Sequence, residues 1–190
     1  LVDMPQPGVQ AGDFGGYVEN EKNLPQNSHA WIFNNARVYD NAQVCDNARV
    51  CNNARVYDNA CVCGKAQVCD NARVYDGAWV YNSACIYDNA RVYSGAHVNS
   101  SAWVSGDAVI CDSADWITVG PSTSSRRFTT AHRDAKLGVR VNCGCFSGSL
   151  TEFAAAIEKT HCGNPQDLAR YRAFHRLIMD VFGKENTNDK

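Results

Sequence analysis

The sequence has no strong net charge and no long hydrophobic run. Its 18 lysines and arginines and 20 acidic residues give a formal net charge of −2. This balance argues against a globally basic nucleic-acid binder but leaves room for a local basic stripe. No stretch of about eighteen consecutive apolar residues occurs, so no membrane span is expected. Residues 1–5 show no basic segment followed by an apolar core, so no signal peptide is predicted and a cytoplasmic location is expected.

What the sequence does have is a six-residue repeat that runs from Ala30 to Ala114. Alanine recurs at every sixth position, and valine or isoleucine follows two residues later as far as Ile110. An apolar pair at i and i+2 fits a short strand with two inward side chains and one outward side chain between them. The Asn, Asp and Gly residues between successive pairs favour turns with positive φ. The repeat therefore predicts short strands joined by tight corners.

A second period, of eighteen residues, groups these units in threes. The segment Asn-Ala-Arg-Val-Tyr-Asp-Asn-Ala at residues 35–42 recurs at 53–60, and closely similar segments stand at 71–78 and 89–96. Three strand-and-corner units make one triangular coil, and successive coils stack with paired backbones. Nearly five such coils, at a spacing of about 4.8 Å, form a prism roughly 22 Å tall.

The pattern Val-x-x-x-Ala-x resembles the hexapeptide repeat of left-handed parallel β-helix proteins, many of which are acyl- or nucleotidyltransferases. Tyr or Cys follows the aliphatic residue where the common form has Gly. This departure is more similar to uncharacterised β-helix proteins of bacteria, phages and prophages. In those proteins a Gly-Asp-x-Gly-Gly segment precedes the helix and a Cys-Gly-Cys-Phe segment follows it, as at residues 12–16 and 143–146 here. The resemblance implies the fold and suggests a phage or prophage factor that inhibits a host component in the host cytoplasm.

Three segments follow from these patterns. We predict an N-terminal cap at residues 1–29, a left-handed parallel β-helix at 30–119 and a small C-terminal α+β module at 120–190. The end of a β-helix exposes strand edges and an open core. We therefore expect Phe14 and Tyr17, together with Leu24, to cover the first coil.

The C-terminal module is expected to contain a β-hairpin and two helices. Alternating segments at residues 127–132 and 139–145 predict the hairpin. Ser149 forms a capping box before the first helix, and Asn164 with the proline that follows it opens the second. The second helix is expected to bury an apolar stripe at helical spacing, which comprises Leu168, Tyr171, Phe174, Leu177, Ile178 and Val181. A basic cluster in this module is expected to be a solvated part of the hairpin and comprises Arg126, Arg127, His132, Arg133 and Lys136.

The outward side chains of the strands form three columns, and one column consists of arginines flanked by tyrosines. Its members are Arg37, Arg55, Arg73 and Arg91 with Tyr39, Tyr57, Tyr75 and Tyr93. Such a face predicts a binding site for an acidic protein or another polyanion, through bidentate arginine contacts and stacking on tyrosine. Two alternatives stay open. Asp40, Asp58 and Asp76 could neutralise arginines that stack on the tyrosine rings, or duplication of the eighteen-residue unit could have produced the ladder without selection for binding.

A second column forms an uncharged patch of Cys61, Cys63, Trp79 and Tyr81. Exposed patches that contain Trp and Tyr mark association surfaces. This patch therefore predicts a homo-oligomer interface, in a dimer or a trimer. The β-helix enzymes that the chain resembles usually form trimers.

The chain contains 10 cysteines, and those in the repeat occupy positions that Tyr, Arg, Gln or Trp fill in other coils. This distribution favours small surface residues with free thiols in a reducing compartment. Cys45 would lie over Cys63 and Cys51 over Cys69, one coil apart, so oxidation of these pairs is conceivable. Cys143, Cys145, His161 and Cys162 have the residue types of a zinc set, but Cys-x-Cys within a strand is a weak metal signature. Core packing is favoured for these four residues, and no metal is predicted.

Enzymatic activity is not favoured. A transferase of this fold would need a histidine base and a groove for its activated donor. His97 is the only histidine within the regular coils, and no long loop interrupts the repeat. The sequence therefore favours a non-enzymatic binding protein without a cofactor. A hexapeptide-repeat acyl- or nucleotidyltransferase and a structural subunit of a larger particle are the alternatives.

Overall fold

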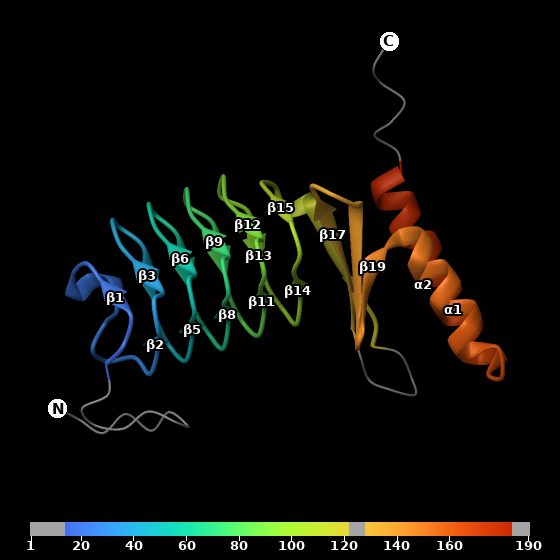
Figure 1. Cartoon of the computed structure of the whole chain (residues 1–190), viewed down its shortest axis with the longest axis horizontal. Coiled ribbons are helices and arrows are strands. Elements are labelled where there is room, and N and C mark those ends of the chain that lie inside the picture. The colour runs from blue at the N-terminus through green and yellow to red at the C-terminus, as the bar shows by residue number, and fades with distance from the viewer. Residues whose placement is uncertain (1–13, 122–127, 184–190) are drawn as a thin grey trace, which may run out of the picture.

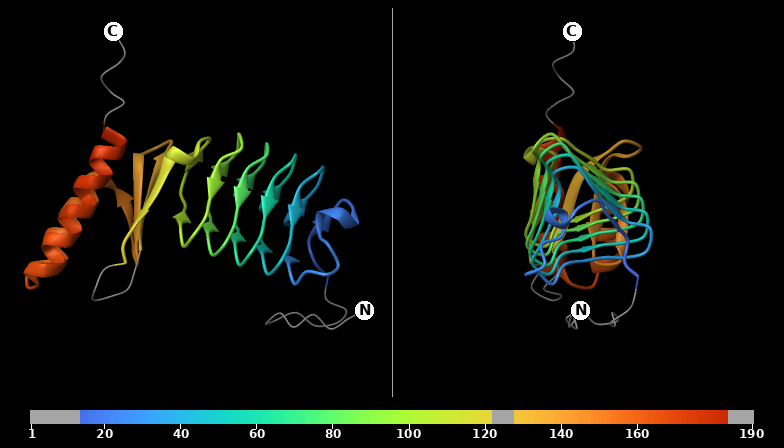
Figure 2. Two further views of the ribbon diagram at one scale, coloured as in Figure 1. Left: turned by 180° about the vertical axis from the view of Figure 1, so that it is seen from behind. Right: turned by 90° about the vertical axis from the view of Figure 1, so that its left-hand side faces the viewer.

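The computed structural model describes residues 14–121 and 128–183. Three sheets of short parallel strands wind around a common axis, and an antiparallel sheet and two helices follow along that axis (Figure 1). A view along the axis shows the coils stacked into a three-sided prism (Figure 2). The predicted parallel β-helix with eighteen-residue coils and a small C-terminal α+β module is confirmed.

Each sheet of the prism collects every third strand. The first sheet contains β1 (Tyr17–Val18), β3 (Arg37–Val38), β6 (Arg55–Val56), β9 (Arg73–Val74), β12 (Arg91–Val92) and β15 (Val109–Ile110). The second contains β2 (Trp31–Ile32), β5 (Arg49–Val50), β8 (Gln67–Val68), β11 (Cys85–Ile86) and β14 (Trp103–Val104), and the third contains β4 (Gln43–Val44), β7 (Cys61–Val62), β10 (Trp79–Val80) and β13 (His97–Val98). From β2 onwards, residues eighteen apart face each other, as Arg37 faces Arg55.

The interior of the prism consists of the two aliphatic positions of the repeat. The alanines from Ala30 to Ala108 and the valines and isoleucines from Ile32 to Ile110 are at most 2 % exposed. Each buried valine or isoleucine contributes about 1.5–3 kcal/mol. The small alanine beside each corner leaves room for the three sheets to meet around a narrow core.

Each corner is a tight turn that a backbone hydrogen bond closes. At the first corner the Ala36 N–H donates to the Phe33 carbonyl at 3.1 Å, and the same contact recurs around the prism. The residue after the first turn position has a positive φ, for example 53° at Asn34 and 60° at Asp70. Asn and Asp enter this region at lower cost than most side chains do. Their side chains also link successive coils, as where Asn52 Nδ2 donates to Asp70 Oδ1 at 2.8 Å.

The prediction of the residues that cover the first coil is confirmed for Leu24 and wrong for Phe14 and Tyr17. Leu24 packs against the core of the prism together with Val18, whereas Phe14 is 100 % exposed and Tyr17 is 57 % exposed. Tyr17 occupies the outward position of β1, and this explains why it cannot cover the core. Residues 1–13 of the predicted cap, and with them the first two residues of the Gly-Asp-x-Gly-Gly segment, lie outside the described residues.

Polar contacts complete this end of the prism. The backbone N–H groups of Gly16 and Tyr17 donate to the carbonyls of Ile32 and Ala36 at 2.8 and 2.9 Å. A 3-10 turn, η1 (Glu21–Asn23), then brings the side chain of Asn23 inside. Asn23 Nδ2 donates to the carbonyls of two further first-coil residues, at 3.0 and 2.8 Å. Donors from residues 16–23 thus form hydrogen bonds with carbonyls at the N-terminal edge of the first coil.

The C-terminal module begins earlier than predicted. After η2 (Ser113–Asp115), four antiparallel strands pair in chain order: β16 (Trp116–Val119), β17 (Thr129–Asp134), β18 (Gly138–Cys143) and β19 (Phe146–Ser149). Residues 116–119, which the sequence pattern assigned to the β-helix, pair instead with β17. The predicted hairpin corresponds to β17 and β18, and the residues of the basic cluster at 126 and 127 lie outside the described part of the chain.

Two helices cover the outer face of this sheet, away from the prism (Figure 2). The first, α1 (Leu150–His161), starts at a capping box in which the Ser149 N–H donates to the Glu152 carboxylate at 2.8 Å. The second, α2 (Pro165–Phe182), starts after Asn164, as predicted. Phe153 and Ile178 are among the residues of the core between the helices and the sheet. Among the described residues, no helix has both the length and the apolar character needed to cross a bilayer.

The inner face of the sheet closes the last coil with side chains. Alternate residues of β17 accept hydrogen bonds from alternate N–H groups of the coil: Trp103 N–H donates to Thr130 Oγ1 at 3.1 Å, Ser105 N–H to His132 Nε2 at 3.3 Å and Asp107 N–H to Asp134 Oδ2 at 3.1 Å. One coil earlier, the equivalent N–H groups donate to backbone carbonyls of the following coil. The side chains of β17 therefore supply the acceptors that backbone carbonyls of a further coil would otherwise provide. His132 is fully buried, so its prediction as a solvated residue was wrong.

One pair of cysteines is oxidised. Cys51 and Cys69, which lie one coil apart, form a disulfide with a Cα–Cα distance of 4.6 Å. This separation lies within the range that a disulfide accepts. The prediction of free thiols was wrong for this pair. The stacking of coils brings these two residues, which are eighteen apart in the sequence, to bonding distance.

Candidate functional site

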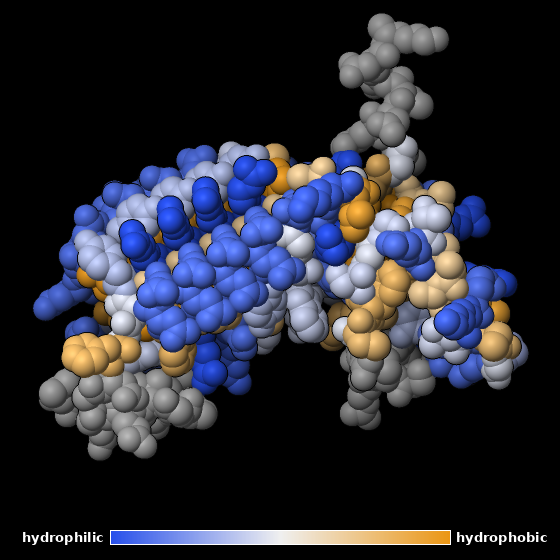
Figure 3. Space-filling model, viewed as in Figure 1, coloured by the Kyte–Doolittle hydropathy of each residue, from blue (hydrophilic) through white to orange (hydrophobic). Residues whose placement is uncertain are grey.

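The four arginines of the first sheet form one straight row. Arg37, Arg55, Arg73 and Arg91 are directly paired along β3, β6, β9 and β12, and all four are exposed. We call this row the arginine ladder. Its strands are about 4.8 Å apart, so the ladder extends roughly 14 Å along the prism. Figure 3 shows parallel rows of hydrophilic side chains along this part of the β-helix.

In the part of the chain that the structure describes, the guanidinium groups of the arginine ladder have no acidic partner. Within the described residues, none of the four takes part in a salt bridge or a hydrogen bond, and none lies over an aromatic ring. Like charges on neighbouring strands repel each other, so the row carries an electrostatic cost in the isolated chain. A ligand with several negative charges would remove that cost.

The tyrosines beside the arginines stack on one another. The ring centroids of Tyr39, Tyr57, Tyr75 and Tyr93 are 5.1, 4.9 and 5.1 Å apart, with interplanar angles of 2°, 1° and 6°. We call this row the tyrosine ladder. Burial raises the pKa of Tyr39, Tyr57 and Tyr93. These phenols therefore stay neutral at physiological pH, and their hydroxyl groups are hydrogen-bond donors beside the cationic row.

Among the described residues, the neighbouring aspartates form no ion pair with the ladder arginines. Asp40 Oδ2 accepts from the Asp58 N–H at 3.5 Å, and Asp76 Oδ2 accepts from the Ser94 hydroxyl at 3.4 Å. Asp40 and Asp76 thus bond to the corners of the next coil rather than to guanidinium groups. The expected stacking of arginine on tyrosine is also absent among the described residues, because the tyrosine rings occupy each other's faces.

A surface pocket lies at the N-terminal end of the arginine ladder. It has a volume of roughly 410 Å³ and is lined by the side chains of Arg37 and Arg55 together with Asn34, Asn35, Asn53 and residues 15–17. Guanidinium and amide groups are hydrogen-bond donors, and the glycines at positions 15 and 16 allow this segment to pack closely against the backbone of the first coil. The arrangement suits a negatively charged group that enters between the first two coils.

The predicted interface patch is brought together on the third sheet. Trp79 is 46 % exposed and stacks on His97 with a centroid distance of 5.9 Å and an interplanar angle of 12°. Tyr81 is half-buried, and its hydroxyl accepts from Asn99 Nδ2 at 2.9 Å. His97 thus contacts an aromatic ring on an open face. No loop is inserted between residues 30 and 110, where every coil is described, so these coils form no walled groove beside His97.

Three thiols also lie close together on the third sheet. The Sγ atoms of Cys45, Cys61 and Cys63 all lie within 4.8 Å of one another, and all three residues are half-buried. Burial and the neighbouring thiols raise the pKa of Cys61 to about 12. Sequence reasoning placed Cys61 and Cys63 in the interface patch and missed the cluster. The sequence spacing could have predicted the cluster. Cys45 lies eighteen residues, or one coil, before Cys63, and Cys61 lies two residues before Cys63.

The four residues of the C-terminal module that have the types of zinc ligands do not form such a cluster. Cys143 Sγ accepts from Thr129 Oγ1 at 3.2 Å, whereas His161 stacks on Tyr171 at 4.5 Å and Cys145 and Cys162 are exposed. In the described part of the chain, the three thiols of the third sheet are the only close group of three or more potential metal ligands.

The geometry and the repeat define a protein of the parallel β-helix, or β-solenoid, class. In agreement with this, a family model described as the YdcK β-solenoid repeat matches residues 42–54, 48–64 and 66–82. These segments cover β4 to β10, in the middle of the prism. Comparison with curated proteins and with solved structures gave no significant match.

Proposed function

We propose that this chain is a non-enzymatic binding protein that presents the arginine and tyrosine ladders to an anionic macromolecule, an acidic protein or another polyanion. The observation that carries the proposal is the row of four exposed guanidinium groups without an acidic partner among the described residues. Arginine forms bidentate hydrogen bonds with carboxylate and phosphate groups. Stacked tyrosines add a rigid surface of hydroxyl donors and ring edges.

The rigidity of the surface supports the same function. The ladder strands are held by backbone hydrogen bonds on both sides, such as the Arg55 N–H to the Ala72 carbonyl at 2.9 Å, and their inward valines are fully buried. A surface that is already ordered loses little conformational entropy on binding. A partner with regularly spaced negative charges would therefore gain contacts on several coils at once.

The resemblance of residues 143–146 to a segment of phage and prophage proteins motivates a narrower form of the proposal. In that form the chain is a phage or prophage factor, and its partner is an acidic component of the host cytoplasm that it inhibits. Affinity purification from a host lysate, compared between the wild-type chain and a ladder variant, would identify such a partner.

Reversing two central arginines, in the variant Arg55→Glu/Arg73→Glu, should reduce binding of the anionic partner at least about 100-fold. Each lost charge-assisted hydrogen bond costs about 1.5–3 kcal/mol, and the new carboxylates add repulsion. The melting temperature should stay the same or rise slightly, because the repulsion between neighbouring arginines is relieved. Binding can be measured by interferometry against immobilised heparin, polyphosphate and captured lysate proteins, at several salt concentrations.

The matched control for this experiment is Lys65→Glu/Arg176→Glu, which changes the net charge equally at two exposed residues outside the ladder. This control should bind as the wild type does. Equal losses in both variants would show a non-specific charge effect, and full binding by the ladder variant would exclude the ladder as the contact surface.

We also propose that the third sheet mediates self-association through Trp79 and Tyr81 with the cysteines beside them. The wild-type chain should then elute as a dimer or trimer at micromolar concentration, and Trp79→Glu should elute as a monomer. Trp103→Glu is the matched control, because Trp103 is 48 % exposed but lies on the second sheet. Light scattering coupled to gel filtration gives the mass, and a wild-type monomer would refute the interface.

A further inference from the structure

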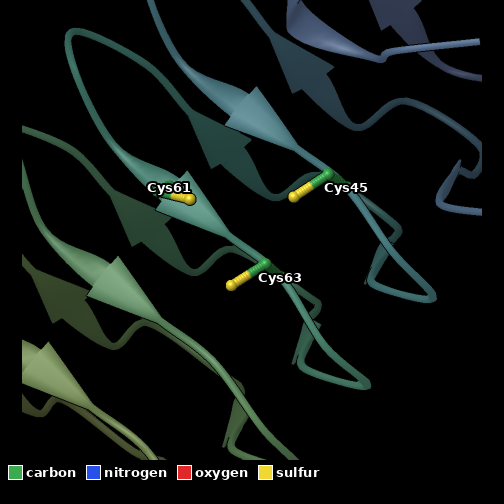
Figure 4. Close-up of side chains that lie close together, drawn as sticks. All are labelled: Cys45, Cys61 and Cys63. Carbon is green, nitrogen blue, oxygen red and sulfur yellow. The ribbon is translucent and has the colours of Figure 1, made fainter. Parts of the chain in front are cut away.

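We propose that Cys45, Cys61 and Cys63 form a binding site for one thiophilic metal ion, with Cu(I) as the best-matched ion. The three Sγ atoms lie within 4.8 Å of one another. Figure 4 shows that they come from two neighbouring coils, with Cys61 inside β7 and the other two residues just after the ends of β4 and β7. The site is independent of the arginine ladder, which lies on the first sheet.

The separation of the sulfur atoms is close to that of a three-coordinate metal site. A metal–sulfur bond of about 2.3 Å requires sulfur atoms roughly 4 Å apart when three thiolates surround one ion in a plane. The observed limit of 4.8 Å exceeds this value by less than 1 Å. Small rotations of the three side chains about χ1 would close the difference without moving the backbone.

The backbone beneath the site is fixed. The Cys45 N–H donates to the Val62 carbonyl at 3.0 Å, and the Cys63 N–H donates to the Val80 carbonyl at 2.9 Å. Val44 and Val62, the inward neighbours of the cluster, are fully buried. The site therefore needs no folding step to assemble. In the single chain, before any association through the third sheet, the partial exposure of all three cysteines gives an ion a direct path from solvent.

The ligand types select the ion. Thiolates favour soft metals such as Cu(I), Zn(II) and iron–sulfur clusters. A structural zinc site takes four protein ligands in a tetrahedron, and this cluster supplies three. The carboxylate of Asp46, which follows Cys45 in the chain, accepts from the Gly64 N–H at 2.9 Å through Oδ2 and does not belong to the group of close ligand atoms. A three-coordinate soft cation fits this ligand set better than zinc does.

Oxidation competes with metal binding at this site. Cys45 and Cys63 lie one coil apart in the same way as Cys51 and Cys69, which form a disulfide. At the third sheet, however, both sulfurs are free thiols and a third thiol lies beside them. A disulfide between Cys45 and Cys63 would make no use of the third thiol, that of Cys61. A trigonal metal site would use all three thiols.

The test is an anaerobic Cu(I) titration of the full chain in competition with the chromophoric chelator bicinchoninate. The wild-type protein should retain one Cu(I) per chain, and Cys61→Ser should lose at least about 100-fold in affinity, because even loss of an outer-shell partner costs 10–100-fold. Cys85→Ser is the matched control, since Cys85 is also half-buried at the outward position of a strand but lies on the second sheet. This control should bind as the wild type does.

X-ray absorption on the wild-type protein loaded with Cu(I) tests the proposal without any variant. A first shell of three sulfurs supports it. A shell with nitrogen or oxygen, unchanged affinity in Cys61→Ser, or equal loss in Cys85→Ser would each overturn it. So would a Cys45–Cys63 disulfide found by mass spectrometry in protein isolated without oxygen. Tighter binding of Zn(II) than of Cu(I), measured in the same way, would overturn the choice of a three-coordinate ion.

Discussion

Lowering the pH from about 7 to about 4.5 is expected to destabilise the junction between the β-helix and the C-terminal module by roughly 2–3 kcal/mol. His132 is the cause. Burial lowers its pKa from the ordinary value of 6.5 to about 4, against the opposing effects of the Arg133 carbonyl and the Asp134 carboxylate, and Arg140 lowers it further. Below pH 6.5 the unfolded chain therefore takes up a proton that the folded chain rejects. The contribution of the neutral His132 side chain to stability is fully present above pH 6.5 and is lost progressively as the pH falls to about 4.

The hydrogen bonds around His132 explain why the ring must stay neutral. Nδ1 lies 3.0 Å from the Arg133 carbonyl and is therefore the protonated nitrogen. Nε2 then accepts from the Ser105 N–H at 3.3 Å and from Asn142 Nδ2 at 3.2 Å. Protonation of Nε2 would turn this acceptor into a donor, which would then face the two N–H donors of Ser105 and Asn142 without an acceptor. Asn142 Nδ2 also donates to the Trp103 carbonyl at 2.8 Å, so the disturbance would spread along the last coil.

Urea unfolding at a series of pH values, with amide exchange at Ser105 as a local probe, measures this effect. His132→Gln retains a side-chain acceptor that does not titrate, so this variant should be less stable at pH 7 but should show little pH dependence between about 4.5 and 6.5. His97→Gln, at an exposed histidine, should keep the wild-type dependence. An unchanged pH profile in His132→Gln would assign the acid sensitivity to other groups.

Replacing Asn23 with leucine is expected to destabilise the first coil by about 3–5 kcal/mol. Asn23 is fully buried, and its side chain serves three backbone groups. Nδ2 donates to the carbonyls of Asp40 and Ala42 at 3.0 and 2.8 Å, and Oδ1 accepts from the Asn20 N–H at 3.0 Å. Leucine has a similar volume but no polar atoms, so all three groups lose their partner. Each backbone group that loses its partner costs about 1–3 kcal/mol. Two of the three contacts are only partly buried, so water can compensate in part and the total stays near the lower end of the summed range.

The effect of Asn23→Leu should be local. Coils of a solenoid contact only their neighbours, so the first coil should open while the middle coils stay folded. Amide exchange should therefore rise at Gly16 and Tyr17 and stay slow at Tyr57. Asn41→Ala, at an exposed residue, is the control and should change stability by less than about 0.5 kcal/mol. Uniform loss of protection across all coils would contradict local opening.

The regular part of the fold was predictable because the repeat shows both the length of each coil and which side chains point into the core. Alanine and valine two residues apart place two side chains inward, and the spacing of the eighteen-residue copies is enough to place the arginines above one another. The arginine and tyrosine ladders were found in this way. What the sequence could not show is whether the aspartates pair with the arginines, because their distance depends on the turn conformation at each corner.

The ends of the prism were less predictable, since there each side chain has more than one possible neighbour. Residues 116–119 alternate as a last coil strand would, and only the pairing with β17 distinguishes the two assignments. Leu177 and Val181 continue the apolar stripe of α2 but are 46 % and 40 % exposed, whereas Phe182 at the end of the helix is buried. His132 was counted with its basic neighbours in the sequence, yet it faces the last coil because it alternates with Ala131.

The side-chain acceptors of β17 have a consequence for assembly. A stack of identical coils has no intrinsic limit to its length, and an unsatisfied terminal edge is a template on which another chain can add strands. Here Thr130, His132 and Asp134 occupy the hydrogen-bond donors that such an addition would need. The molecule therefore blocks its own elongation at this end, and growth into end-to-end filaments would first require the module to detach. The self-association proposed above would then have to use the flanks of the prism, where the arginine ladder and the cysteine-bearing sheet lie.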